Sequence, residues 1–207
     1  MSPALCYLDV SPLSDAALFR RCLEDLPWEE RKQRVLRYRF EKDRMLCLGA
    51  GILARHMLTR AGATDLRLRR EEWGRPCLTA HPDIHFSLSH SGILAVCAVS
   101  PSPVGIDVET ARWDPDIAPL CFQEEEIQWI LSSPDRDLAF LRLWTRKESY
   151  LKRLGTGLSR SPAGFSVLPG GPLEEEVHFL EATVMNHQVC ACFSPGEKAE
   201  LQAWHLK

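Results

Sequence analysis

The predicted elements of this chain occur in the same order twice: a strand, then helices, then strands. The first set begins with a strand at residues 4–10, continues with helices between residues 14 and 61, and ends with a hairpin at residues 84–100. The tetrapeptide PSPV at residues 101–104 marks a boundary, because two prolines this close together interrupt helices and strands alike. The sequence therefore predicts two similar halves that meet near residue 103.

A second set of elements follows this boundary. It comprises a strand, two helices and four further strands, at residues 104–109, 122–133, 137–155, 165–168, 176–184, 187–194 and 199–206. No repeat of individual residues accompanies the repeated order. The predicted similarity of the two halves is therefore one of architecture.

Charge and composition exclude several classes of protein. The 207 residues carry 25 Lys and Arg against 28 Asp and Glu, so the chain lacks the net positive charge typical of nucleic-acid-binding proteins. It contains no run of about 18 apolar residues that could span a membrane, and its first residues do not resemble a secretory signal. The eight cysteines include no C-x-x-C pair of the kind that binds zinc, so we interpret them as reduced core residues of a cytoplasmic protein.

Two carboxylates alternate in the strand predicted at residues 104–109. Asp107 and Glu109 are two residues apart and therefore share one face of the strand. Such a pair is ordinarily exposed to solvent, but its neighbours here are apolar, and Gly105 would allow another backbone to approach closely. A buried pair of carboxylates needs a cation. Without histidine or cysteine pairs nearby, the carboxylate oxygens favour Mg²⁺ over zinc.

The helix that ends in LWTRKESYLKRLGTGL, residues 143–158, carries charges beside its apolar residues. At about 100° per residue, Lys147, Glu148 and Lys152 lie on the same broad face as Trp144. One interpretation is local, because Glu148 and Lys152 are spaced as a stabilising i,i+4 pair. The other is that this face contributes a carboxylate and two cations to a site.

Polar residues that suit phosphate groups occur in the first half. FSLSHSG, residues 86–92, places Ser89 and His90 at a strand end, but the G-x-S-x-G motif of serine hydrolases is absent. A structural strand end is one interpretation, and contact with phosphate oxygens is the other. Arg75, in the rigid turn WGRP, and the arginine-rich residues 30–44 add cations that could face a polyanion.

These motifs are weak singly, but their order is specific. WGRP, FSLSHS, VGIDVE, F-x-x-x-E and W-T-x-K-E-S-x-x-K-x-x-G-x-G-L follow one another, and the similarity covers residues 31–165. The set resembles the phosphopantetheinyl transferases, of the larger type that activates surfactin synthetase. The resemblance implies an α+β fold with two similar α/β halves related by pseudo-twofold symmetry, each a small, mostly antiparallel sheet packed with helices. The active site would lie in the cleft between residues 1–103, which contact the nucleotide, and residues 104–207, which hold the metal and the catalytic groups.

Members of this family transfer the phosphopantetheine arm of coenzyme A to a serine of an apo acyl or peptidyl carrier protein and release 3′,5′-ADP. The resemblance implies that Asp107, Glu109 and Glu148 hold Mg²⁺, or Mn²⁺ in its place. Glu148 would also be the catalytic base, and Lys152 would assist catalysis. Glu126 matches a further acidic position near the site. The residues implied to contact coenzyme A are Arg31, Arg34, Arg75, Ser89, His90, Lys147 and Lys152.

Two other functions fit the same residues. With water as the acceptor, the chain would be a Mg²⁺-dependent hydrolase of coenzyme A or another nucleotide pyrophosphate. Without turnover, it would be a coenzyme A-binding or carrier-binding module. For the transferase we expect a cytoplasmic monomer whose partners are coenzyme A and an apo carrier, with no nucleic acid and no membrane. The carrier is expected to dock on residues 111–130, with Trp113 and Ile117 exposed.

Overall fold

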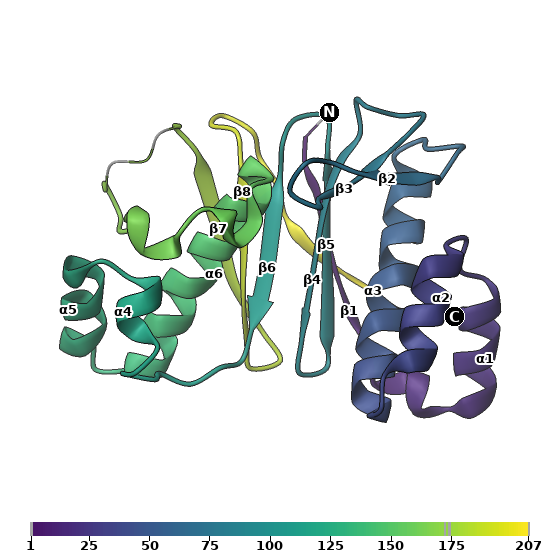
Figure 1. Cartoon of the computed structure of the whole chain (residues 1–207), viewed down its shortest axis with the longest axis horizontal. Helices are drawn as coiled ribbons and strands as arrows, with labels where there is room; N and C mark the ends of the chain where they lie inside the picture. The colour runs from purple at the N-terminus through teal and green to yellow at the C-terminus, as the bar shows by residue number, and fades with distance from the viewer. Residues whose placement is uncertain (1, 172, 174, 207) are drawn as a thin grey trace.

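Two halves stand side by side in the computed structural model, which describes residues 2–171, 173 and 175–206 (Figure 1). In each half one long helix packs against a sheet: α3 (Glu41–Arg60) in the first half and α6 (Arg136–Leu154) in the second. The two sheets face each other in the middle of the molecule, and the helices cover their outer sides (Figure 1). The predicted α+β fold with two similar halves is therefore confirmed.

The first sheet has the strand order β4–β5–β1–β9. Its strands are β1 (Ala4–Asp9), β4 (His85–Ser91), β5 (Leu94–Ser100) and β9 (Leu201–Trp204). Neighbouring strands are antiparallel except β1 and β9, which are parallel. A strand that the sequence assigned to the second half, β9, thus completes the sheet of the first half.

Strand β5 is buried along its whole length, which explains its nearly continuous apolar sequence. Ala95 and Cys97 belong to the core beneath α3, whereas Leu94 and Val96 belong to a core that both halves share. A strand covered on both faces needs apolar residues at every position rather than at every second one. Strand β8 (His187–Phe193) is also buried throughout and has the corresponding central place in the second sheet.

Short elements surround α3 in the first half. They are η1 (Ser11–Ser14), α1 (Ala16–Glu24), α2 (Glu29–Arg37), β2 (Leu68–Arg70) and β3 (Pro76–Leu78). Helices α1 and α2 pack on α3, while β2 and β3 form a small hairpin at one end of the half (Figure 1). Among the described residues, no helix is both long enough and apolar enough to cross a membrane.

The second sheet has the strand order β6–β8–β7, and all its neighbours are antiparallel. Its remaining elements are β6 (Gly105–Glu109), α4 (Ala118–Cys121), α5 (Glu124–Ser132), η2 (Gly157–Ser159), η3 (Pro162–Gly164) and β7 (His178–Val184). Helix α6 crosses β6 in direct backbone contact: a Cβ on Gly105 would come within 1.8 Å of the Ser149 carbonyl oxygen. The close approach predicted at Gly105 is confirmed, and it places the functional face of α6 beside the carboxylate strand.

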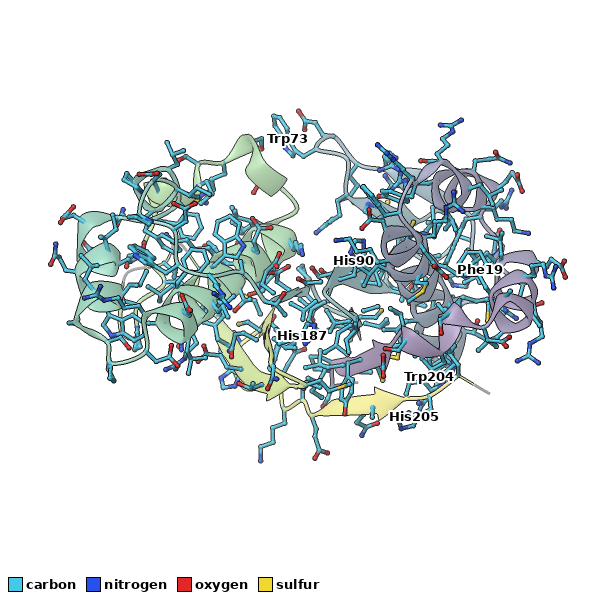
Figure 2. The ribbon with its side chains drawn as sticks, turned by 90° about the horizontal axis from the view of Figure 1, so that it is seen from below. Phe19, Trp73, His90, His187, Trp204 and His205 are labelled. Carbon is cyan, nitrogen blue, oxygen red and sulfur yellow. The ribbon has the colours of Figure 1, made fainter. Side chains whose placement is uncertain are left out.

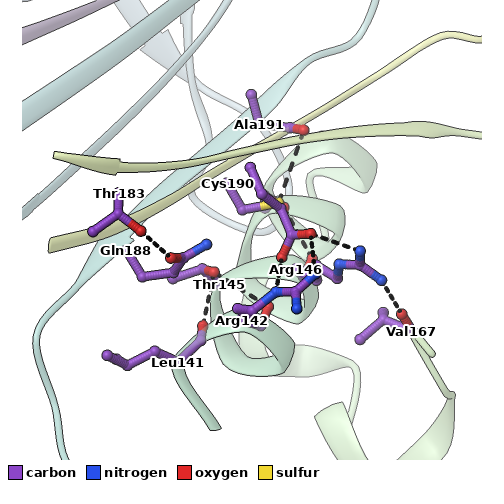
Figure 3. A network of polar contacts seen from close by, with 11 residues as sticks. Leu141, Arg142, Thr145, Arg146, Val167, Thr183, Gln188, Cys190 and Ala191 are labelled. Atoms are coloured by element: carbon purple, nitrogen blue, oxygen red, sulfur yellow. Dashed lines mark hydrogen bonds and ion pairs between the residues drawn. The ribbon is translucent and has the colours of Figure 1, made fainter. Parts of the chain in front are cut away.

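The strand predicted at residues 165–168 is wrong, since all four residues are described and form irregular chain. The backbone of this segment forms hydrogen bonds with side chains, and not with a neighbouring strand. The Val167 N–H donates to Glu126 Oε1 (2.8 Å), and the Val167 carbonyl accepts from Arg146 Nη1 (3.0 Å; Figure 3). Phe165 and Val167 are buried against the helices, so their apolar character reflects burial and not strand pairing.

Candidate active site between the halves

A cavity of about 1000 Å³ lies between the two halves. The first half contributes the start of α2, the β2–β3 hairpin and β4, and the second contributes the end of α6 and the glycine-rich turn after it. Figure 2 shows Trp73 and His90 of the first half on the side that faces the second half. Of the seven residues predicted to contact coenzyme A, six line this cavity: Arg31, Arg34, Arg75, Ser89, His90 and Lys152.

Positively charged side chains outnumber negatively charged ones along the wall of the cavity. Besides the predicted cations, Arg67 and Arg70 line it, each paired with a carboxylate: Arg67 with Asp65 (2.6 Å) and Arg70 with Glu30 (2.8 Å). Neither residue was predicted from the sequence, although the concentration of arginine just before WGRP was a signal that could have identified both. An excess of cations in a concave site suits a ligand that carries several phosphates.

Arg75 joins the two halves at the edge of the cavity. Its Nε donates to Glu71 (2.7 Å), and its Nη1 donates to the Arg153 carbonyl in the last turn of α6 (3.3 Å). The guanidinium lies against Gly155, which ends α6 in the left-handed conformation (φ 76°), and a Cβ there would come within 3.0 Å of it. A cation is favourable at this end of a helix, where carbonyls lack partners and the dipole is negative.

The alternating serines of β4 bind β6 across the boundary between the halves. The Ser87 hydroxyl accepts a hydrogen bond from the Ile106 N–H (3.1 Å), and the Ser91 hydroxyl donates to Glu109 (2.9 Å). Serines two residues apart share one face of β4, so together they connect the two strands through side chains. These contacts explain the alternation in FSLSHSG.

Asp107 lies at the centre of this contact and has only 2% of its surface exposed. Its Oδ1 accepts hydrogen bonds from Ser89 and from Lys152, both at 2.6 Å. Its Oδ2 is buried and has no partner among the described residues. A buried carboxylate oxygen without a donor is unfavourable, so Asp107 has room for one more cationic partner.

Glu109 and Glu148 feel the charge of Asp107. Burial raises the pKa of Glu109, the negative charge of Asp107 raises it further, and the hydrogen bond from Ser91 opposes both effects. Burial also raises the pKa of Glu148; Lys152 opposes this, while Asp107 and Glu109 add to it. The three predicted metal carboxylates are thus close enough to repel one another, which is the situation that a bound cation relieves.

The oxygen atoms of these carboxylates are the donors that Mg²⁺ prefers, but the three side chains are not close enough together to bind one ion. In the part of the chain that the structure describes, no three His, Cys, Asp or Glu side chains gather closely enough to hold a metal ion. The Lys152 ammonium lies beside Asp107. The donor set is nevertheless the one that Mg²⁺ prefers, since it consists of carboxylate oxygens, one of them buried and unpaired.

Lys147 and Glu126 lie apart from the cavity, inside the second half. Both side chains are fully buried, and the Lys147 Nζ is 2.7 Å from Glu126 Oε2. The same Nζ donates to the carbonyls of Pro162 (2.7 Å) and Phe165. Burial lowers the pKa of Lys147, and the Glu126 carboxylate opposes this. An ammonium group has three N–H donors, and these partners use them all, so the structure does not support the predicted contact between Lys147 and a coenzyme A phosphate.

The segment predicted to dock the carrier is only partly exposed. Trp113 packs edge-on against Phe140 (ring centroids 5.9 Å apart) and borders the core of the second half, so its predicted exposure is wrong. Ile117 is exposed as predicted, at 47%, and Leu120 of α4 is exposed at 71%.

Comparisons with known proteins agree with these features. Residues 103–204 match the family described as the 4'-phosphopantetheinyl transferase superfamily, and residues 14–102 match 4'-phosphopantetheinyl transferase, N-terminal. The 4'-phosphopantetheinyl transferase Sfp of Bacillus subtilis (strain 168) is 34% identical over 145 residues, which are 67% of this chain and 64% of that protein. A 4'-phosphopantetheinyl transferase of Bacillus subtilis is 32% identical over 167 residues, 78% of this chain and 73% of that protein.

A third relative, the 4'-phosphopantetheinyl transferase gsp of Aneurinibacillus migulanus, is 37% identical over 136 residues, 63% of this chain and 56% of that protein. The chain thus spans between 56% and 73% of the lengths of these three relatives. The two family matches adjoin at residues 102 and 103 and together cover both halves and the cavity between them. The chain therefore belongs to the 4'-phosphopantetheinyl transferase superfamily.

Proposed function

We propose that this chain transfers the 4'-phosphopantetheine arm of coenzyme A to a serine of an apo acyl or peptidyl carrier protein and releases 3′,5′-ADP, with Mg²⁺ or Mn²⁺ as cofactor. The cavity between the halves carries the proposal, because it combines cations for several phosphates with the buried carboxylate Asp107. In this reaction the serine oxygen bonds to the phosphorus that bears pantetheine. The bond from that phosphorus to the oxygen of ADP breaks, and a base takes the serine proton.

The cations of the cavity would bind the phosphates of coenzyme A. Arg31, Arg34 and Arg75 can each present two N–H groups to one phosphate, and they would hold the nucleotide end. Lys152 would approach the pyrophosphate from the second half. Within the described residues its ammonium bonds to Asp107 only, and 26% of its side chain is exposed, so donors remain for a ligand. Ser89 and His90 would add polar contacts from β4.

Three carboxylates would hold the metal: Asp107, Glu109 and Glu148. When bound, Mg²⁺ would offset the charge of the pyrophosphate and of the leaving group. Glu148 would take the proton of the acceptor serine. Its place on α6, beside Asp107 and Lys152, supports this role, because burial and the neighbouring carboxylates raise the pKa of Glu148 and so make it a stronger base than an exposed carboxylate.

The acceptor serine would arrive on the carrier, so the chain needs no nucleophile of its own. Ile117 and Leu120 follow β6 along the chain and would contribute an apolar docking surface for the carrier. We expect the chain to act as a cytoplasmic monomer.

The test is incubation with coenzyme A, Mg²⁺ and a panel of apo carriers from fatty-acid, polyketide and peptide synthetases, followed by intact-mass measurement. Transfer predicts that one carrier gains the mass of a phosphopantetheine arm while 3′,5′-ADP appears. Release of free phosphopantetheine without any carrier would favour the hydrolase. Binding of coenzyme A without turnover on any carrier would favour the binding module.

A further inference from the structure

We propose that the buried pair formed by Lys147 and Glu126 positions one wall of the cavity. The pair holds the segment at residues 162–167, which comprises η3 and the irregular chain after it, against α6, and this segment in turn holds the glycine-rich turn at residues 155–157 that borders the cavity. Lys147 would thus set the affinity for coenzyme A without touching it. The identity of the ligand rests on the proposed function, whereas the mechanical link rests on contacts within the chain.

Lys147 is enclosed on every side by groups of the second half. Its three donors go to Glu126 and to two backbone carbonyls, those of Pro162 and Phe165. Its ammonium also lies over the rings of Phe165 (4.6 Å) and Phe122 (5.6 Å). Cation–π contacts of this kind are strongest when the cation is desolvated, as it is here. The lysine is therefore bound to the segment at two points of its backbone and by one of its rings.

Glu126 holds the same segment at Val167. Its Oε1 accepts the Val167 N–H (2.8 Å), while its Oε2 accepts both the Lys147 ammonium (2.7 Å) and the Gln123 N–H (3.0 Å). The last contact is half of the capping box that begins α5. One carboxylate therefore connects α5, α6 and the segment.

The turn that borders the cavity lies between two attachments to α6. It begins where α6 ends, at Gly155, and it reaches the segment at Pro162, which Lys147 holds. Lys147 is eight residues before Gly155, about 12 Å along the helix. Both ends of this loop are thus tied to one rigid element, and tying the ends restricts the conformations of a loop.

Two neighbouring arginines strengthen the attachment. Arg146 Nη1 donates to the Val167 carbonyl (3.0 Å; Figure 3). Within the loop, the guanidinium of Arg160 lies 4.9 Å from the ring of Phe165 and 6.0 Å from that of Tyr150. Gly155 and Gly157, which line the cavity, are therefore only a few residues from contacts that depend on the pair.

The test uses the full chain with Lys147→Met, Glu126→Gln and the double variant. Each single substitution leaves one buried charge without its partner and should lower the melting temperature strongly, whereas the double variant removes both charges and should recover much of that loss. The matched control is Arg55→Gln, which removes an ion pair of α3, with Asp25, and involves neither the segment nor the residues that line the cavity.

Two readouts are taken on variants that are folded at the assay temperature. In the double variant, amide hydrogen exchange at residues 165–167 and at residues 155–159 should be at least about tenfold faster, which corresponds to about 1.4 kcal/mol less protection. The Kd for coenzyme A, measured by calorimetry, should rise at least about fivefold, the lower end of typical coupling between separate sites. Arg55→Gln should leave both readouts unchanged.

Two outcomes would overturn the proposal. If the double variant exchanges faster only at residues 165–167 and keeps the wild-type Kd, the pair supports the core alone. If Lys147→Met weakens coenzyme A binding while Glu126→Gln does not, Lys147 acts by direct contact. Hydrogen exchange is measured without coenzyme A. If the wild-type chain binds no coenzyme A, the proposed function fails. The exchange at residues 155–159 then still decides whether the buried pair holds the wall of the cavity.

Discussion

Two faces of α6 use the same residue types under different conditions. On the face toward the cavity, Lys152 pairs with Asp107 and keeps 26% of its side chain exposed. On the face toward the core of the second half, Lys147 pairs with Glu126, and neither side chain is exposed. The lysines are five residues apart, so at about 100° per residue they point about 140° away from each other.

The two lysines differ in how many N–H donors of the ammonium group remain for a ligand. Lys147 uses its three donors on Glu126 and two backbone carbonyls, whereas in the described structure Lys152 bonds to Asp107 alone. A lysine whose donors are all used inside the protein supports the fold, and one with unused donors at a cavity wall can bind a ligand. Residue type within the motif K-E-S-x-x-K therefore does not distinguish support from binding.

Removal of divalent metal should have the largest effect on activity and should distinguish the two faces of α6, because it acts on the cavity face alone. EDTA should abolish transfer, and added Mg²⁺ or Mn²⁺ should restore it, since the carboxylates alone would repel the pyrophosphate. The measurement is carrier modification by intact mass, with the melting temperature followed in parallel and expected to change little. Full activity in metal-free buffer would exclude a metal role for Asp107, Glu109 and Glu148.

The substitution Glu148→Gln should have the next largest effect. It removes a metal ligand and the proposed base while it keeps the shape of the side chain, so kcat should fall at least about a hundredfold, the scale of a lost acid–base group. Calorimetry should show nearly wild-type affinity for coenzyme A. The matched control is Glu125→Gln, at an exposed position of α5, which should be fully active. Near-normal turnover of Glu148→Gln would leave Glu148 only as a local partner of Lys152.

Substitutions of the two lysines should differ in how strongly they weaken coenzyme A binding. Lys152→Ala should weaken coenzyme A binding by about 1.5–3 kcal/mol, the usual value of a charge-assisted hydrogen bond. The double variant Lys147→Met/Glu126→Gln should weaken it less. The exposed control Lys42→Ala should not change it.

Salt provides an independent distinction between the two positions. If Lys152 contacts a phosphate, its loss should reduce the dependence of the Kd on ionic strength, because one exposed charge interaction has been removed. The double variant at the buried pair should keep the wild-type salt dependence. The same reduction in both variants would contradict the separation of the two faces.

We expect the smallest effect from substitutions on the surface of the second half, where Ile117 and Leu120 of the α4 region are exposed. Ile117→Ser together with Leu120→Ser should raise the KM for the carrier several-fold, while the Kd for coenzyme A and the melting temperature stay near wild type. Added salt should change this KM only modestly, because apolar contacts are little screened. Unchanged carrier kinetics would place the docking surface elsewhere.

Features that depend on local spacing could be predicted from the sequence. Asp107 and Glu109 share a face because they alternate on a strand, and Gly155 ends α6 because glycine adopts the left-handed conformation easily. The strand predicted at residues 165–168 was wrong because a local run of apolar residues does not show what buries it. Burial of Phe165 and Val167 beside helices selects the same residue types as strand pairing does.

The sequence by itself determined the two-halved α+β fold, the family and the charged residues from which the site is built. Only the tertiary structure decided which charges meet: Lys152 and Ser89 converge on Asp107, whereas Lys147 is closed off by Glu126. It also decided that β9 joins the sheet of the first half. The physical reason is that periodicity specifies the direction of a side chain relative to its own helix or strand, whereas what lies in that direction depends on packing between segments far apart along the chain.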